Sequence, residues 1–304
     1  MNTSPFVTRC VALLAAFCLS SAVTAAADDA RPPYLLRYKF APGETVRWQV
    51  EHLATVRNTV AGTTQTAETK TKSVKVWKII KVDDQGNATF THSVSSVDMI
   101  QKLTGRQEVR YNSETDKKPP VGFEQVAADI GIPLTEITIS PRGETIKREE
   151  KRDRPQPSAS QITILLPKDE VAVGDEWNFP YTEKVAHQDG HVKEVKTRQR
   201  FKLEKVSDGI ATISVETQIL TPIHDPVIEA QLVQRETKGS VRFDIKQGRI
   251  ISQRMDLDKR VHGSQGGASL MHYVTRFTEK ILSGAPKTAR RAAGPELPPG
   301  LNVK

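Results

Sequence analysis

The chain has 304 residues, of which 37% are hydrophobic and 26% charged, and its formal net charge is +8. This length allows two modest domains or one large β-domain. Aromatic residues make up only 6%, which argues against a nucleic-acid-binding surface on which successive bases stack. The basic residues are spread along the chain and favour an anionic neighbour, such as an acidic component of a cell envelope.

Residues 1–27 are predicted to be an export signal. A single basic residue, Arg9, precedes the short apolar run VALLAAFCLSSAV, and small residues follow near Ala25 to Ala27. An N-terminal membrane anchor is the alternative, but the run is too short to span a bilayer and no later stretch qualifies. We therefore expect a periplasmic or secreted protein after signal-peptide cleavage, and not an integral membrane protein.

Both cysteines, Cys10 and Cys18, lie within the predicted signal. The processed chain would then contain no thiol, which excludes a disulfide, a thiolate-bound metal and a cysteine nucleophile. An exported protein of this kind depends on its hydrophobic core for stability, as expected for a bacterial envelope protein.

After the signal, apolar residues recur at every second position, which predicts β-strands. Several strands are ten to fifteen residues long, and strands of that length predict a strongly curved antiparallel sheet, either a half-barrel or a barrel. Three sets of alternating residues are expected to share a face, namely Val46, Trp48, Val50, His52, Ala54 and Val56; Ala88, Phe90, His92 and Val94; and Ile251, Gln253, Met255 and Leu257.

Two halves of the chain resemble each other. KVWKIIKVDDQGNATFTHSV (residues 75–94) aligns with RQRFKLEKVSDGIATISVET (residues 198–217), and shorter blocks on both sides align in the same order. This pattern predicts two similar tandem β-units, at residues 34–155 and 160–283, forming either one continuous sheet or two barrels. The proline-containing segment DRPQPSAS between them indicates a linker.

Two segments depart from the strand pattern. GFEQVAADIGI, residues 122–132, predicts one short helix in the first unit. The tail, residues 284–304, is rich in proline, glycine and alanine, and we expect it to be disordered.

The stretch TISPRGETIKREE contains Ser140-Pro141-Arg142-Gly143, which suggests either an anion-binding loop or a turn between two strands. An anion-binding loop requires successive backbone amides and is usually followed by a helix, whereas a charged strand follows here. The aligned stretch of the second unit, Asp244 to Gly248, keeps only a polar residue and a glycine. Both features predict a hairpin turn.

Histidines give one metal-like spacing, His187 and His191, with Asp189 between them. Because Asp189-Gly190 marks a hairpin tip, the two imidazoles would lie on opposing strands, and an exposed turn is the simpler interpretation than a surface metal site. His92 aligns with Val215 and is expected to be a half-buried sheet residue. His224 and His262 are interpreted as loop residues.

No catalytic motif is present. The chain lacks a Gly-x-Ser-x-Gly turn, a His-Glu-x-x-His pair, a phosphate-binding Gly-Lys-Ser/Thr loop and a dinucleotide fingerprint. The neighbouring carboxylates Asp83-Asp84 and Glu149-Glu150 lie in a turn and on a charged strand, without apolar surroundings that would raise a pKa. We therefore predict no enzyme activity, no cofactor, no metal and no catalytic residues.

Three segments resemble a family of uncharacterised exported bacterial proteins with a domain of unknown function. They are YLLRYKFAPGETVRWQV after the signal, ITISPRGE at the end of the first half and LPKDEVAVGDEW at the start of the second. The resemblance covers residues 34–282. Its motifs are turns and strand starts, so it implies a shared fold and no catalytic residues.

Two functions are consistent with the sequence. The first is a non-catalytic envelope scaffold that binds a protein or an anionic envelope component. The second is a periplasmic carrier of a lipid or other apolar ligand, held in the hollow of a half-barrel. The alternating faces are rich in small aliphatic residues and poor in rings, which favours the scaffold.

Overall fold

The computed structural model describes residues 33–152, 161–186 and 191–283. All of them belong to one unit that begins at Pro33. They form one antiparallel sheet of twelve strands. In chain order the strands are β1 (Thr45–Val60), β2 (Thr63–Val82), β3 (Ala88–Leu103), β4 (Val109–Asn112), β5 (Pro133–Ile139), β6 (Thr145–Glu150), β7 (Glu176–Ala186), β8 (Val192–Ser207), β9 (Ile210–Ile219), β10 (Lys238–Asp244), β11 (Arg249–His262) and β12 (Ser269–Ile281).

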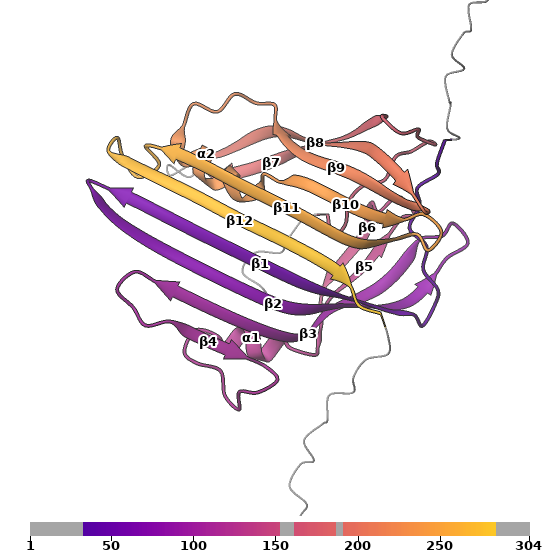
Figure 1. Cartoon of the computed structure of the whole chain (residues 1–304), viewed down its shortest axis with the longest axis horizontal. Coiled ribbons are helices and arrows are strands. Elements are labelled where there is room, and N and C mark those ends of the chain that lie inside the picture. Colours follow the sequence, from indigo (N-terminus) through magenta and orange to yellow (C-terminus); the bar gives the residue numbers. More distant parts are fainter. Residues whose placement is uncertain (1–32, 153–160, 187–190, 284–304) are drawn as a thin grey trace, which may run out of the picture. The chain divides into compact units, whose positions relative to one another are not determined.

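The two halves of the chain share this single sheet. Its order is β6-β5-β3-β2-β1-β12-β11-β10-β9-β8-β7, and β4 pairs with β3 outside this path. The halves join where β1 pairs with β12, from Trp48 opposite Ile281 to Val60 opposite Ser269 (Figure 1). Thus the described residues form one continuous sheet and not two barrels.

The sheet is open, and the predicted half-barrel is confirmed. Its order ends at β6 on one side and at β7 on the other. Each edge carries a feature that opposes pairing with another chain: β6 has the charged sequence TIKREE, and β7 contains Pro180, which has no N–H to donate.

The predicted long strands are confirmed, because β1, β3 and β8 have 16 residues each and β2 has 20. One residue on β11 lies differently from the sequence pattern. The β10–β11 register skips Ile251 between the pairs Phe243–Ile250 and Arg242–Ser252. This β-bulge makes Ile250 the buried residue in place of Ile251, whereas Gln253, Met255 and Leu257 share a face as predicted.

A short helix follows β4 in the first half and β9 in the second. The predicted helix is present as α1 (Glu124–Asp129). A second helix, α2 (Pro226–Leu232), was not predicted, and the 3₁₀ turn η1 (Val233–Arg235) follows it. Asp225 caps α2 by accepting a hydrogen bond from the Val227 amide, and Pro226 stands at its first turn. None of the helices in the described ranges is long and apolar enough to cross a membrane.

Residues that align in sequence occupy similar places in the two halves. The β2–β3 register shifts between Ile79 and Lys81, and the β8–β9 register shifts between Leu203 and Lys205. The Gly43 amide donates to the carbonyl of Ile79, and the Gly174 amide donates to that of Leu203. A tandem duplication would produce such parallels; the common origin of the halves stays a prediction.

Each half contributes its own buried cluster. In the first half, Trp77 stacks on Phe90 with ring centroids 4.2 Å apart. In the second half, Trp177 stacks on Phe201 at 5.5 Å. Two segments outside the strands complete the second cluster with buried Leu36, Leu165 and Leu166. These segments pack against buried residues of β8, β9 and β10.

Candidate functional site

A cavity of about 690 Å³ lies against one face of the sheet. Side chains from β3 and from β8 both line it, although six strands lie between these two in the sheet order. One cavity can contact both strands because the sheet curls around it, so this face is the concave one. Pockets that hold small molecules have volumes of about 300–1,000 Å³.

The cavity combines apolar walls with charged and polar groups. The apolar side chains come from β1, β3, β9, β11 and β12 and include Val50, Val94, Val215, Met255, Leu257 and Phe277. The polar groups include Ser73, Lys75, Gln253, Thr275 and Glu279. Such a surface suits a ligand with an apolar body and a polar group.

Lys75 of β2 and Glu279 of β12 form an ion pair on the floor of the cavity. The Lys75 Nζ lies 2.8 Å from each carboxylate oxygen of Glu279. The Glu279 side chain is only 3% exposed and that of Lys75 is 15% exposed. A buried carboxylate is stable only with a close counter-ion, so the two groups depend on each other.

Two tryptophans hold the Lys75 ammonium in place. Its Nζ lies 4.5 Å from the ring centroid of Trp48 and 5.0 Å from that of Trp77, within the range of a cation–π interaction. The rings meet edge to face at 4.9 Å, and the Trp48 Nε1 donates to the Ile250 carbonyl at 3.0 Å. The positive charge therefore occupies a fixed position at the floor.

The ammonium retains one hydrogen-bond donor. Lys75 has three N–H groups, and the two contacts to Glu279 are the only hydrogen bonds that its Nζ makes among the described residues. Because Lys75 lines the cavity, a ligand oxygen could accept the third.

His52 and Thr275 form a second polar contact in the cavity, with His52 Nε2 2.9 Å from Thr275 Oγ1. The single proton of the Thr275 hydroxyl is donated to the Leu53 carbonyl at 3.0 Å. The hydroxyl therefore accepts from a protonated Nε2, and the imidazole does not act as a base toward it. Burial lowers the pKa of His52, which favours the neutral ring. This contact is structural and does not activate a nucleophile.

One wall of the cavity is the segment of residues 161–168, which we call the strap. Gln161, Ile162, Thr163 and Ile164 of the strap line the cavity. The Tyr38 hydroxyl lies 2.5 Å from Thr163 Oγ1 and donates to the Ile164 carbonyl at 3.1 Å. Burial raises the pKa of Tyr38 well above its ordinary value, so the hydroxyl keeps its proton and stays a donor.

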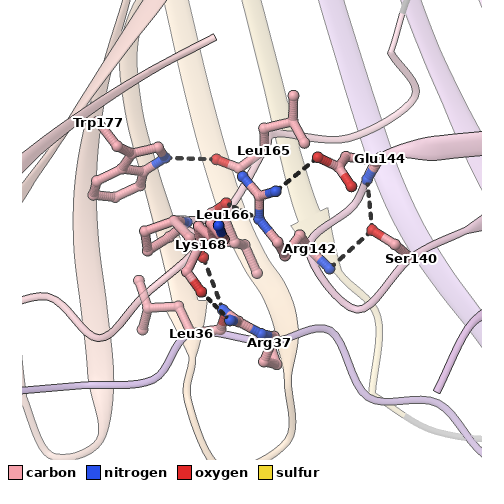
Figure 2. A network of polar contacts seen from close by, with 10 residues as sticks. Leu36, Arg37, Ser140, Arg142, Glu144, Leu165, Leu166, Lys168 and Trp177 are labelled. Carbon is pink, nitrogen blue, oxygen red and sulfur yellow. Dashed lines mark hydrogen bonds and ion pairs between the residues drawn. The ribbon is translucent and has the colours of Figure 1, made fainter. Parts of the chain in front are cut away.

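Two arginines hold the far end of the strap (Figure 2). Arg37 donates to the carbonyls of Pro167 at 2.8 Å and Lys168 at 2.5 Å. The Arg142 Nε donates to the Leu166 carbonyl at 3.2 Å, while the Leu166 amide donates back to the Arg142 carbonyl at 2.9 Å. Charged donors make strong hydrogen bonds to carbonyls, so these arginines fix the wall of the cavity.

The stretch Ser140-Pro141-Arg142-Gly143 is the tight turn that the sequence predicted. It joins β5 to β6, and the Ser140 side chain accepts hydrogen bonds from the amides of Arg142 and Glu144. Gly143 has a φ of +88°, and a Cβ there would lie 2.7 Å from the Ile164 carbonyl oxygen. The turn therefore requires glycine for two reasons, its backbone conformation and its contact with the strap.

The histidines lie partly where the sequence placed them. His92 is half-buried on β3 and lines the cavity together with Val215, the residue with which it aligns. His224 lies in a loop, but His262 is the last residue of β11 and not a loop residue. His187 and Asp189 lie outside the described residues, and within the described ones no group of three metal-ligating side chains occurs.

Sequence reasoning missed Lys75 and Glu279 as a pair. Each stands at an inward position of an alternating strand, where a charged residue is uncommon, and that was the available signal. The partners are 204 residues apart, so nothing local in the sequence joins them. It also missed the structural role of Arg142, because the strap lies in a different half of the chain.

Residues 152–250 match the model of a family of unknown function, DUF6263. A comparison of the sequence with curated proteins returns no significant match. Among solved structures, DynF from the dynemicin biosynthesis pathway of Micromonospora chersina is 7% identical; the match covers 82% of this chain and 92% of DynF, with a TM-score of 0.21. A chain of the Pseudomonas aeruginosa MucA/MucB complex is 10% identical over 79% of this chain and 89% of that one, with a TM-score of 0.12. At these TM-scores neither likeness bears on fold or function.

Proposed function

We propose that the protein is a non-catalytic binding protein that holds an amphiphilic small molecule in the cavity on its concave face. One observation carries the proposal: the apolar walls of a cavity of about 690 Å³ end at a fixed ammonium that is half-buried. Of the two functions consistent with the sequence, this is the carrier.

The walls and floor favour different parts of one ligand. Val50, Met255 and Phe277 offer apolar contact, and each CH₂ group removed from water contributes about 0.8 kcal/mol. At the floor, the third N–H of Lys75 requires an acceptor once a ligand displaces water. The ligand class is therefore an apolar chain or ring system that carries an oxygen acceptor, such as a carboxylate, phosphate, carbonyl or hydroxyl.

The polar groups of the cavity support binding rather than catalysis. The Thr275 hydroxyl donates to a backbone carbonyl, and His52 donates to Thr275. Lys75 is held by Glu279. Acyl transfer requires a nucleophile that donates its proton to an adjacent base. In the first pair, the imidazole of His52 is the donor and the hydroxyl of Thr275 is the acceptor. In the second pair, Lys75 and Glu279 are held together as opposite charges.

The location of the proposed activity follows from the export signal predicted in residues 1–27. After cleavage, the protein would bind its ligand in the periplasm or outside the cell. The competing envelope scaffold would act there as well, but it would have an empty cavity and a protein or anionic partner.

The test is to purify the protein from its native envelope, extract it with organic solvent and identify the extract by mass spectrometry. We expect one amphiphilic class at near-stoichiometric amount. The stripped protein should then bind the fluorophore 1-N-phenylnaphthylamine, and Ser73→Trp, which fills the cavity, should abolish that binding. Lys72→Trp places the same ring on the other face of β2 and should leave binding unchanged.

An empty extract together with equal fluorophore binding by both variants would refute the proposal. Capture of a stoichiometric protein partner by the empty protein would favour the scaffold.

A further inference from the structure

The face of the sheet opposite the cavity, here called the outer face, carries a separate recess of about 580 Å³. It lies over β1, β10, β11 and β12, around the β-bulge at which the β10–β11 register skips Ile251. The extra residue of a bulge bends its strand and increases the local twist. Ile251, Ser252 and Ile281 also line the recess.

Four cations line this recess: Arg249 of β11, which is paired with Glu44, and three others, Arg47 of β1, Arg242 of β10 and Lys280 of β12. The register places Arg242 opposite Ser252, and Ser252 opposite Lys280, so these residues form a row across three strands. Strands lie about 4.8 Å apart, which puts the backbones of Arg242 and Lys280 about 10 Å from each other. The Leu282 amide donates to the Arg47 carbonyl, which places Arg47 diagonally next to Lys280.

The three cations have no carboxylate partner within the described ranges, whereas their cationic neighbours do. Arg249, which also lines the recess, pairs with Glu44, and Arg254 pairs with Asp256 at 2.6 Å. Gln49 is the β1 residue opposite Lys280, and Glu51, two residues further along β1, accepts a hydrogen bond from Gln49 and lies 4.0 Å from Lys72. Exposed like charges at such separations repel each other weakly in water, and an anion bound between them would remove that repulsion.

The other half of the chain provides an internal comparison. The β5–β6 register shifts between Thr138 and Ile139, the positions that align with Arg242 and Phe243. Thr138 occupies the place of Arg242 there. Lys147 stands opposite Thr138, in the place of Ser252, so that bulge has one cation beside it, whereas Ser252 has Arg242 on one side and Lys280 on the other.

We propose that Arg47, Arg242 and Lys280 form a binding site for a phosphate-class oxyanion. Two arginines and a lysine supply three positive charges and many N–H donors, which a dianion with several oxygens satisfies better than a single carboxylate does. The Ser252 hydroxyl adds a neutral donor or acceptor in the middle of the row. The source of the phosphate is either a small soluble molecule or a lipid headgroup, and both offer the same group to the site.

The experiment compares the full chain with Arg47→Gln/Arg242→Gln/Lys280→Gln. The control is Lys70→Gln/Lys78→Gln/Lys102→Gln, which changes exposed lysines of β2 and β3 that have no ion pair among the described residues. Both variants reduce the formal charge from +8 to 8 − 3 = +5. Thermal unfolding is measured in phosphate and in chloride at equal ionic strength, and sedimentation is measured with vesicles of phosphatidylglycerol or phosphatidylcholine.

A bound anion raises Tm because it binds the folded state only. We expect phosphate to raise Tm of the wild type and the control, and the site variant to bind about tenfold more weakly because it lacks three charged contacts. In chloride the site variant should be at least as stable as the wild type, since repulsion has been removed; that result would show that it folds.

The vesicles identify the source. The site is assigned to a lipid headgroup if the wild type and the control prefer phosphatidylglycerol vesicles, the site variant loses that preference, and phosphate does not shift Tm. A Tm shift without vesicle binding assigns it to a soluble phosphate. Equal losses in the two variants would attribute binding to diffuse charge and overturn the proposal, and so would the absence of binding to both probes.

Discussion

The Lys75 ammonium contacts both carboxylate oxygens of Glu279 at 2.8 Å across the junction of the two halves of the sheet. Lys75 lies on β2 and Glu279 on β12, with β1 between them. The pair therefore depends on the pairing of β1 with β12, which is the only connection between the halves within the sheet. Stability and ligand binding are both expected to depend on it.

Lys75→Met should destabilise the protein by about 3–5 kcal/mol, because it leaves a buried carboxylate without its counter-ion. Adding Glu279→Gln should recover part of this loss, since the second change removes the stranded charge. Denaturant unfolding of both single variants and the double variant gives the coupling free energy. Strictly additive effects would show that the two groups do not interact.

Gly143→Ala should destabilise the protein more than Gly62→Ala. Both glycines have a positive φ, +88° and +82°, so both substitutions incur a backbone penalty of about 1–2 kcal/mol. Only at Gly143 would the new Cβ meet other atoms, 2.7 Å from the Ile164 carbonyl oxygen and from a ring carbon of Tyr38. Chemical denaturation of the two variants measures the difference, and equal losses would mean that the strap shifts freely.

Arg142→Ala should loosen the strap. The guanidinium donates to the Leu166 carbonyl, and a hydrogen bond from a charged donor contributes about 1.5–3 kcal/mol. We expect faster hydrogen exchange of the Leu166 amide. The control is Arg110→Ala, which breaks an exposed ion pair with Asp98 and should change stability by less than about 1 kcal/mol. Unchanged exchange at Leu166 would show that the Arg142 side chain does not hold this part of the strap.

Local pattern in the sequence was enough for the strands and the turns. Alternation placed Trp48, Val50 and His52 on one face because side chains in a strand alternate strictly. It was wrong at Ile251, since a bulge shifts the register by one residue and no local signal marked it. The helix α2 was overlooked, although Asp225-Pro226 is a recognisable helix start.

The candidate site was less accessible to sequence reasoning. Its floor and wall are formed by pairings across the chain, such as Lys75 with Glu279 and Arg142 with Leu166. Which strands become neighbours is decided by the burial of whole faces, and a single sequence does not contain that information locally. The preference for a scaffold rested on the scarcity of rings, but four of the rings, those of Tyr38, Phe40, Trp48 and Trp77, lie together next to Lys75 and Glu279.

Stability should fall as the solution becomes acidic, and His52 should contribute to that fall. Burial lowers the pKa of His52 below its ordinary value of 6.5, so the unfolded chain binds a proton more readily than the folded one does. The contribution of the neutral ring is complete above about pH 6.5 and is lost as the pH falls through the lower, folded pKa. His52→Gln should therefore make the free energy of unfolding less dependent on pH below neutrality, as measured by urea titrations between about pH 7 and pH 5. The same substitution at exposed His262, at the end of β11, controls for the loss of a histidine as such. Identical pH profiles of wild type and His52→Gln would show that the cavity leaves this imidazole as well solvated as in the unfolded chain.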